Sequence, residues 1–137
     1  MKFMVIVHAT PESESGAPPS PELIAQMGRY NEELAKAGVL LDGAGLRPSR
    51  DAWRVQYDGE RRQVVDGPFA EVQSLVAGYT LIQTRTRDEA LEWSRRFPNP
   101  AVEGGAAQIE VRQLFELEEF GDNKAVDRIR ELGLQKA

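Results

Sequence analysis

Apolar residues lie at strand-like spacing in several short segments, and the first of these is apolar on both faces. Phe3, Val5 and Val7 alternate with Met4 and Ile6, and the segment closes on a histidine. A strand that is apolar on both sides is typical of a central position in a sheet with both faces covered. Residues 77–84 have the same character. We therefore expect these two segments to be the innermost strands.

Three further segments favour strands. Residues 53–57 alternate apolar and polar side chains, and Asp58-Gly59 predicts a tight turn into a partner strand at 61–65. Residues 39–41 form a short apolar segment that opens into Asp-Gly-Ala-Gly-Leu, which we interpret as a bulged or bent strand end. Residues 109–115 predict the last core strand.

Two helices have clear boundaries. Ser20 is the expected cap of the first, Pro21 its first residue, and Gly38 its end. Its apolar stripe consists of Leu23, Met27, Tyr30 and Leu34. Gly28 lies in the middle of this helix, where glycine is unfavourable unless another backbone passes close by, so we expect tight packing there.

The second helix is predicted to begin at a capping box formed by Thr86 and Glu89 and to stop at Pro98. A third, after residue 122, is expected to be capped by Asp122 and to place Ala125, Val126, Ile129 and Leu132 on one side. Because it is too short to be stable alone, we expect it to dock on the body or on a partner subunit.

The order of elements is strand, helix, strand, hairpin, strand, helix, strand. This order predicts an α+β domain with an antiparallel sheet, two helices on one face, an inserted β-hairpin and a C-terminal helix. The second face of the sheet is then bare, although its central strands are apolar on both sides. A second copy of the chain is the simplest cover for that face, so we expect a homodimer.

Composition narrows the class of protein. With 137 residues the chain suits one domain, and its lack of cysteine excludes disulfides and thiolate chemistry. A formal charge of -5 and a pI near 5.0 argue against a direct nucleic-acid partner. No apolar run is long enough to cross a membrane, and Met1 leads directly into a predicted strand. We expect a cytoplasmic protein.

Two stretches interrupt the regular pattern. Residues 10–20 contain three prolines, three serines and a glycine, which predicts a mobile loop that would cover the end of the first strand as a lid. Residues 66–71, Asp-Gly-Pro-Phe-Ala-Glu, must turn sharply because of Gly67 and Pro68. Asp66 and Glu71 have two interpretations: turn and backbone hydrogen bonds, or carboxylates that face a pocket.

His8 is the only histidine, and it lies at the carboxyl end of the first strand. It is a candidate general base, with Asp66 or Asp42 to orient it, or else a hydrogen-bonded structural residue. Asp42 has the alternative of ordinary turn chemistry beside Gly43. One histidine with scattered carboxylates has no metal-ligand spacing, and no cofactor motif is present, so we expect neither metal nor cofactor.

The remaining candidates are ligand contacts. Tyr79 and Trp53 would form an aromatic wall for a flat ligand, or they are core or subunit contacts. Arg29, on the rim of the first helix, would clamp an anionic ligand, or it pairs with Glu32 or Glu33 on the surface.

The hexapeptide at 66–71, the following Gly-Tyr strand, the start Met-Lys-Phe-Met and residues 38–46 together resemble the DGPF group of the YCII-related superfamily. The resemblance covers about residues 1–116 and leaves 117–137 as a helical tail. It implies a bacterial, cytoplasmic, ferredoxin-like domain that dimerises as an α+β barrel. It also implies a functional link to sigma factors of the extracytoplasmic-function type, although this chain contains no helix-turn-helix of its own.

The resemblance also identifies two missing groups. Better-studied relatives have a histidine early on the first helix and an aspartate just after the second. Aligning the two helices places Met27 and Phe97 near those positions. The lyase or dehydrochlorinase chemistry of such relatives is therefore not expected here.

Three hypotheses follow. The first is a homodimeric, non-catalytic module that binds a small ligand between the sheet, the first helix and the 10–20 loop, or serves an accessory role. The second is a small lyase or isomerase in which His8 moves a proton. The third is a purely structural, self-associating domain.

Overall fold

The computed structural model describes residues 1–134, and a four-stranded antiparallel sheet forms its centre. The strands lie in the order β2 (Leu40–Gly45), β5 (Val76–Gln83), β1 (Lys2–His8) and β6 (Ile109–Gln113). The two segments with apolar residues on both faces, β1 and β5, are the inner strands. This confirms the prediction from the alternation of their side chains.

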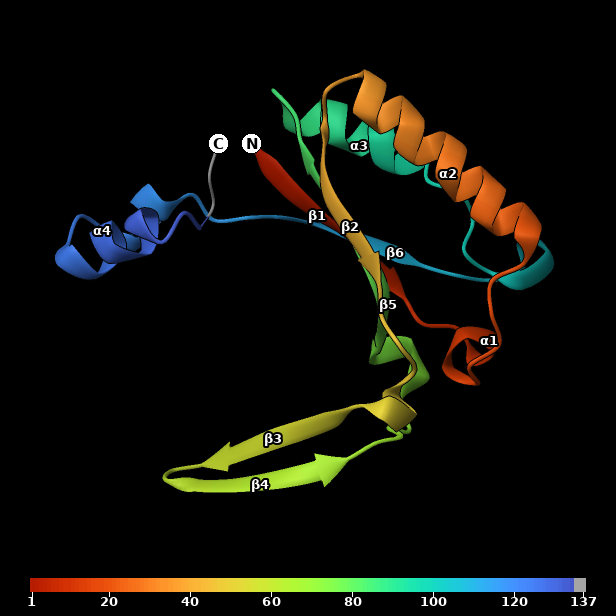
Figure 1. Ribbon diagram of the computed structural model, residues 1–137, viewed down its shortest axis with the longest axis horizontal. Coiled ribbons are helices and arrows are strands. Elements are labelled where there is room, and N and C mark those ends of the chain that lie inside the picture. The colour runs from red at the N-terminus through yellow and green to blue at the C-terminus, as the bar shows by residue number, and fades with distance from the viewer. Residues whose placement is uncertain (135–137) are drawn as a thin grey trace.

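Helices α2 (Pro21–Lys36) and α3 (Arg87–Arg95) cover one face of the sheet (Figure 1). The succession β1-α2-β2-β5-α3-β6, with this strand order, is the ferredoxin-like topology. The predicted fold class is therefore confirmed. None of the helices within residues 1–134 is long and apolar enough to span a membrane.

The core lies between the sheet and these helices. Phe3 pairs with Ile82 across β1 and β5, and both side chains point toward the helices. They pack with Tyr30 and Leu34 of α2, and all four side chains are buried. Apolar burial of this kind is the main favourable contribution to folding.

The predicted helix ends are largely present. The Ser20 hydroxyl accepts a hydrogen bond from the Leu23 amide at 3.1 Å, and Gly38 has a φ of 74° after the end of α2. At α3, the Thr86 hydroxyl accepts from the Glu89 amide at 3.1 Å. The Glu89 carboxylate accepts from the Arg85 amide at 3.2 Å and not from that of Thr86, so the predicted capping box is half formed.

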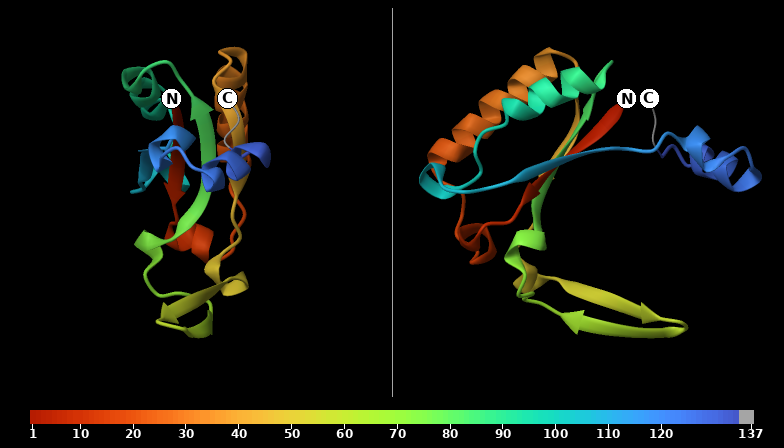
Figure 2. Two further views of the ribbon diagram at one scale, coloured as in Figure 1. Left: turned by 90° about the vertical axis from the view of Figure 1, so that its left-hand side faces the viewer. Right: turned by 180° about the vertical axis from the view of Figure 1, so that it is seen from behind.

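Two elements project from the face opposite α2 and α3. The hairpin of β3 (Trp53–Asp58) and β4 (Arg61–Asp66) pairs only within itself, apart from the main sheet. Helix α4 (Lys124–Glu131) follows β6 at the other end. Figures 1 and 2 show both elements reaching out on the same side, with the bare face of the sheet between them.

Four expectations about local structure were wrong. Residues 10–20 include a one-turn helix, α1 (Pro11–Glu14), capped by Thr10. Asn123, not Asp122, caps α4, through a bond from the Val126 amide at 3.0 Å. A Cβ at Gly28 would meet nothing within 4 Å, and Phe115 is exposed.

Short 3₁₀ helices complete the described chain. They lie at Ser49–Asp51, Val72–Ser74, Val102–Gly104 and Leu117–Phe120. The first and second of these flank the hairpin and determine how it leaves the main sheet.

Candidate functional site

A cavity of about 910 Å³ lies between the β2 edge of the sheet, helix α2 and the loop after α1. This size is within the range of small-molecule sites. Leu23, Met27 and Asn31 project into it from one face of α2, because positions four residues apart lie above one another on a helix. Phe97 closes the wall beyond α3. The cavity lies where the sequence predicted a ligand, between sheet, first helix and the 10–20 loop.

Most of the cavity wall is apolar. Among the described residues that border it, none is Lys, Arg or Glu, and the charged or titratable ones are His8, Asp42 and Tyr79. The strand side is formed by the Asp-Gly-Ala-Gly segment of β2, whose register shifts between Leu40 and Asp42. The predicted bulge is therefore present, and its glycines leave the wall without bulky side chains.

His8 borders this cavity, but both nitrogens of its ring face protein oxygens. Nδ1 lies 3.0 Å from the Gln73 carbonyl oxygen, and Nε2 lies 3.2 Å from Oε1 of Glu110. A neutral imidazole has a single N–H, so both bonds form together only when the ring is protonated. In this arrangement neither nitrogen offers a free lone pair to a ligand.

Glu110 is the carboxylate that His8 meets, and it was not among the sequence candidates. The register of β6 places Glu110 opposite Ile6 of β1, on the face away from the helices. Its second oxygen lies 3.9 Å from Nε of Arg112. No local signal in the sequence pairs positions 102 residues apart, so only the strand order brings these two groups together.

Asp42 also borders the cavity, and its carboxylate accepts a hydrogen bond from the Gly43 amide at 2.8 Å. This is the local turn-like bond that was the alternative to a site role. Tyr79 borders the cavity on the β5 side. Its neighbour in the proposed aromatic wall, Trp53, lies on the hairpin and borders a separate cavity of about 430 Å³.

The Asp-Gly-Pro-Phe turn fastens the segment before β3. The Gly67 amide donates to the Ala52 carbonyl at 2.9 Å, and the Phe69 amide donates to the Ser49 hydroxyl at 2.9 Å. A Cβ at Gly67 would lie 1.7 Å from the Ser49 carbonyl oxygen, so only glycine fits. The Arg54 guanidinium stacks on Phe69 at 3.7 Å from the ring centroid.

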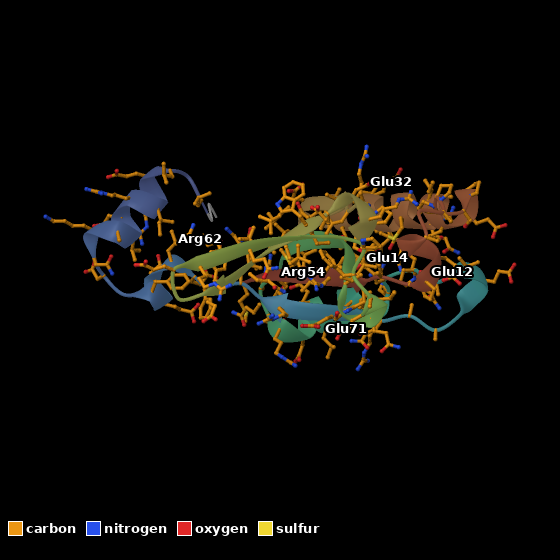
Figure 3. All side chains as sticks on the ribbon, turned by 90° about the horizontal axis from the view of Figure 1, so that it is seen from below. Glu12, Glu14, Glu32, Arg54, Arg62 and Glu71 are labelled. Atoms are coloured by element: carbon orange, nitrogen blue, oxygen red, sulfur yellow. The ribbon has the colours of Figure 1, made fainter. Side chains whose placement is uncertain are left out.

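The two acids of this stretch, Asp66 and Glu71, are exposed. Within residues 1–134, no hydrogen bond or ion pair joins Asp66 or Glu71 to His8. Figure 3 labels Glu71 and Arg54, which come from the segment before β5 and from β3. Arg29 is also exposed, and it borders a third hollow of about 470 Å³ beside Arg96.

The loop that covers the cavity is tied to the same turn. The carboxylate of Glu14 accepts a hydrogen bond from the Ser49 amide, and Nη1 of Arg50 donates to the Ser15 carbonyl at 3.1 Å. Ser49 thus connects α1 on one side with Phe69 on the other. The hexapeptide therefore affects the cavity indirectly. It holds the segment of Ser49 and Arg50, and this segment is hydrogen-bonded to the loop that covers the cavity.

Asn31 is the cavity residue that the sequence analysis missed. It lies four residues after Met27 and eight after Leu23, so it continues the stripe that faces the sheet. Its Oδ1 is buried and has no hydrogen-bond partner. A polar side chain at helical spacing within an apolar stripe was the available signal.

The fold and the cavity together define a class: a small ferredoxin-like α+β domain with a ligand-sized, mainly apolar cavity under one helix. The sequence model of the YCII-related domain matches residues 1–117. The chain therefore belongs to the YCII-related domain family, as the resemblance predicted.

Two known proteins resemble this chain. An uncharacterised protein of Rhizobium meliloti is 27% identical over 93 residues, which cover 68% of this chain and 75% of that protein. A solved structure of 5-chloro-2-hydroxyhydroquinone dehydrochlorinase from Burkholderia phenoliruptrix, in complex with 2,5-dihydroxybenzoquinone, is 13% identical. It aligns with 84% of this chain and 94% of its own length, with a TM-score of 0.46.

Proposed function

We propose that this chain is a homodimeric, non-catalytic module that binds a small, mainly apolar ligand in the cavity under α2. The observation that carries this proposal is the composition of the wall. Met27 and Phe97, the two positions that the resemblance aligns with a histidine and an aspartate, both border the cavity. An apolar pair at these positions favours binding and offers no proton transfer.

The dimer part of the proposal rests on the bare face of the sheet. Met4 pairs with Leu81, and Ile6 pairs with Tyr79, so these four side chains form one apolar strip opposite the helices. The hairpin and α4 stand on either side of it (Figure 2). A second copy that placed its own strip against this one would remove both from water.

The binding proposal is tested by filling the cavity. Thermal-shift screening with uncharged aromatic compounds, aromatic acids and small anions should give stabilising hits among the uncharged compounds, because a ligand that binds the folded state raises its unfolding temperature. Met27→Trp should abolish these shifts. Arg29→Ala is the matched control on α2, outside the cavity, and should retain them. If no compound of the panel raises the unfolding temperature of the wild-type chain, a purely structural, self-associating domain is favoured instead.

A second candidate function is a small lyase or isomerase in which His8 moves a proton. The observation in its favour is the Glu110 carboxylate at 3.2 Å from Nε2, which would orient the ring in place of Asp66 or Asp42. Proton transfer at the other nitrogen, Nδ1, then requires its contact with the Gln73 carbonyl to open. Deuterium incorporation into a ligand found by the screen, followed by NMR, tests it. Incorporation that His8→Gln abolishes would establish this candidate, and no incorporation would dismiss it.

The resemblance suggests an accessory role beside a sigma factor of the extracytoplasmic-function type. In that setting the ligand-bound module would act through a protein partner and not through chemistry of its own. Co-purification of the full chain with such a sigma factor, with and without a ligand from the screen, is the direct measurement.

A further inference from the structure

The buried side-chain oxygen of Asn31 is at odds with the rest of the cavity. Its neighbours on the inner stripe of α2, Leu23 and Met27, are apolar, as is Phe97 opposite. Among residues 1–134, Oδ1 of Asn31 is the single buried side-chain polar atom without a hydrogen-bond partner. A buried acceptor without a donor destabilises a folded chain, so a residue of this kind calls for an explanation.

Four other polar residues of the cavity wall have side chains that already bond protein groups. Thr10 and Ser13 bond each other in the cap of α1. Asp42 accepts from the Gly43 amide, and both ring nitrogens of His8 face protein oxygens. Asn31 differs from them, because it is the wall residue with a buried polar atom that no group within residues 1–134 satisfies.

The charge of the wall limits the class of ligand. Because no Lys or Arg of residues 1–134 borders the cavity, a carboxylate or phosphate would lose its hydration without gaining a cationic partner among them. A hydroxyl group both donates and accepts, so it satisfies the oxygen of the amide and, after rotation about the last side-chain bond, its nitrogen as well.

We infer that Asn31 selects the ligand of this cavity, and that the ligand is an uncharged, mainly apolar molecule carrying a hydroxyl group. This inference rests on the proposed binding function and deepens it, since it names the chemical class and the residue that recognises it. The apolar wall supplies affinity, and the amide discriminates between an alcohol or phenol and a hydrocarbon of the same shape.

The test compares three probes of one shape, 2-naphthol, 2-methylnaphthalene and 2-naphthoate, by their dissociation constants. The variant is Asn31→Leu, which keeps the approximate volume and removes the amide. The ratio of the constants for 2-methylnaphthalene and 2-naphthol should be about threefold to tenfold larger for the wild-type chain than for the variant, the usual net effect of one hydrogen bond. The difference in hydration between the probes cancels in this comparison.

Met27→Leu is the matched control, because it changes a neighbouring cavity residue without changing polarity. It should leave the ratio at its wild-type value. The naphthoate should bind more weakly than the naphthol to all three proteins.

The outcomes separate the inference from the proposed function. If the naphthyl probes bind but the ratio is equal in the wild-type chain and in Asn31→Leu, the inference is overturned and the binding function stands. Preferred binding of the naphthoate also overturns it. If no probe binds the wild-type chain, the proposed function itself fails.

A second measurement needs no ligand. Without a probe, Asn31→Leu should unfold at a higher temperature than the wild-type chain, because it removes an unpaired buried acceptor and extends the apolar stripe. An amide with a purely structural role would give the opposite result, and a lower unfolding temperature would overturn the inference.

Discussion

Two glycines show how differently the same residue type is used in this fold. Gly67 passes so close to the Ser49 carbonyl that a Cβ has no room, whereas Gly28 in the middle of α2 faces open space. Neither has a positive φ, so surroundings and helix propensity decide their effects. The sequence predicted that Gly67 lies in a sharp turn. The prediction of tight packing at Gly28 was wrong, because the space around a helical residue depends on which other elements pack against that face.

Gly67→Ala should lower the free energy of unfolding by at least about 2 kcal/mol, since the turn must move away from Ser49. Gly28→Ala, the matched control, should raise it by about 1 kcal/mol through helix propensity alone. Urea unfolding of both variants measures this. A stable Gly67→Ala variant would mean that the turn does not fasten the 49–52 segment.

Tyr30 gives the second prediction at this scale. Its hydroxyl donates to the Trp93 carbonyl at 2.7 Å, and its ring meets Trp93 and Phe97 edge-on. Burial raises the pKa of Tyr30 from 10.0 to about 12; the Arg96 cation opposes this shift and the Glu33 carboxylate adds to it.

The unfolded chain therefore releases the Tyr30 proton near pH 10, while the folded chain keeps it to about pH 12. The stability that Tyr30 contributes is complete below pH 10 and is lost as the pH rises from 10 to 12. Tyr30→Phe should show a flatter decline in urea unfolding over that range, and equal slopes for the two proteins would contradict the prediction. At neutral pH, Tyr30→Phe should cost about 1 kcal/mol for the lost hydrogen bond.

At the scale of elements, the longer helices α2 and α3 were found from sequence, and the one-turn helix α1 was not. Ser20, Pro21 and Gly38 delimit α2 because capping is a local interaction. The one-turn helix α1 was missed because four residues carry too little periodicity, and its stability depends on the link from Glu14 to Ser49, which is distant in sequence. Asp122 and Asn123 are both good caps, and the chain path selected the second.

Ser49 joins three of these elements, so it provides the prediction at this scale. Ser49→Ala leaves the Phe69 amide without its acceptor and should lower the free energy of unfolding by about 1–3 kcal/mol. Ser74→Ala removes a comparable hydroxyl, which donates to the Glu71 carbonyl at 2.8 Å in an exposed position, and should change stability by less than about 0.5 kcal/mol. Equal effects in chemical unfolding would refute the role assigned to Ser49.

The whole molecule is organised around a sheet with one covered face and one bare face. Helices α2 and α3 cover the first, while the hairpin and α4 extend beside the second (Figure 1). The hairpin carries exposed Trp53 and Tyr57. At the base of the other projection, the rings of Phe115 and Phe120 pack at a tilt with centroids 5.0 Å apart. These aromatic side chains frame the apolar strip through which we propose that two copies meet.

Light scattering at micromolar concentration should give twice the mass of one chain. Ile6→Glu introduces a charge into the apolar strip and should yield monomers, because two such carboxylates would face each other away from water. Ile24→Glu, on the exposed face of α2, is the matched control and should remain dimeric. A wild-type mass of one chain would dismiss the dimer.

The sequence by itself determined the class of fold and the ends of its main helices, because side-chain alternation, helical spacing and caps are local properties of the chain. It also determined the turn at residues 66–71 through Gly67 and Pro68. Only the tertiary structure decided which polar groups meet: His8 with Glu110 across the sheet and Ser49 with Phe69. It also left Oδ1 of Asn31 without a partner among residues 1–134. Such pairings depend on strand order and register, which join residues far apart in sequence.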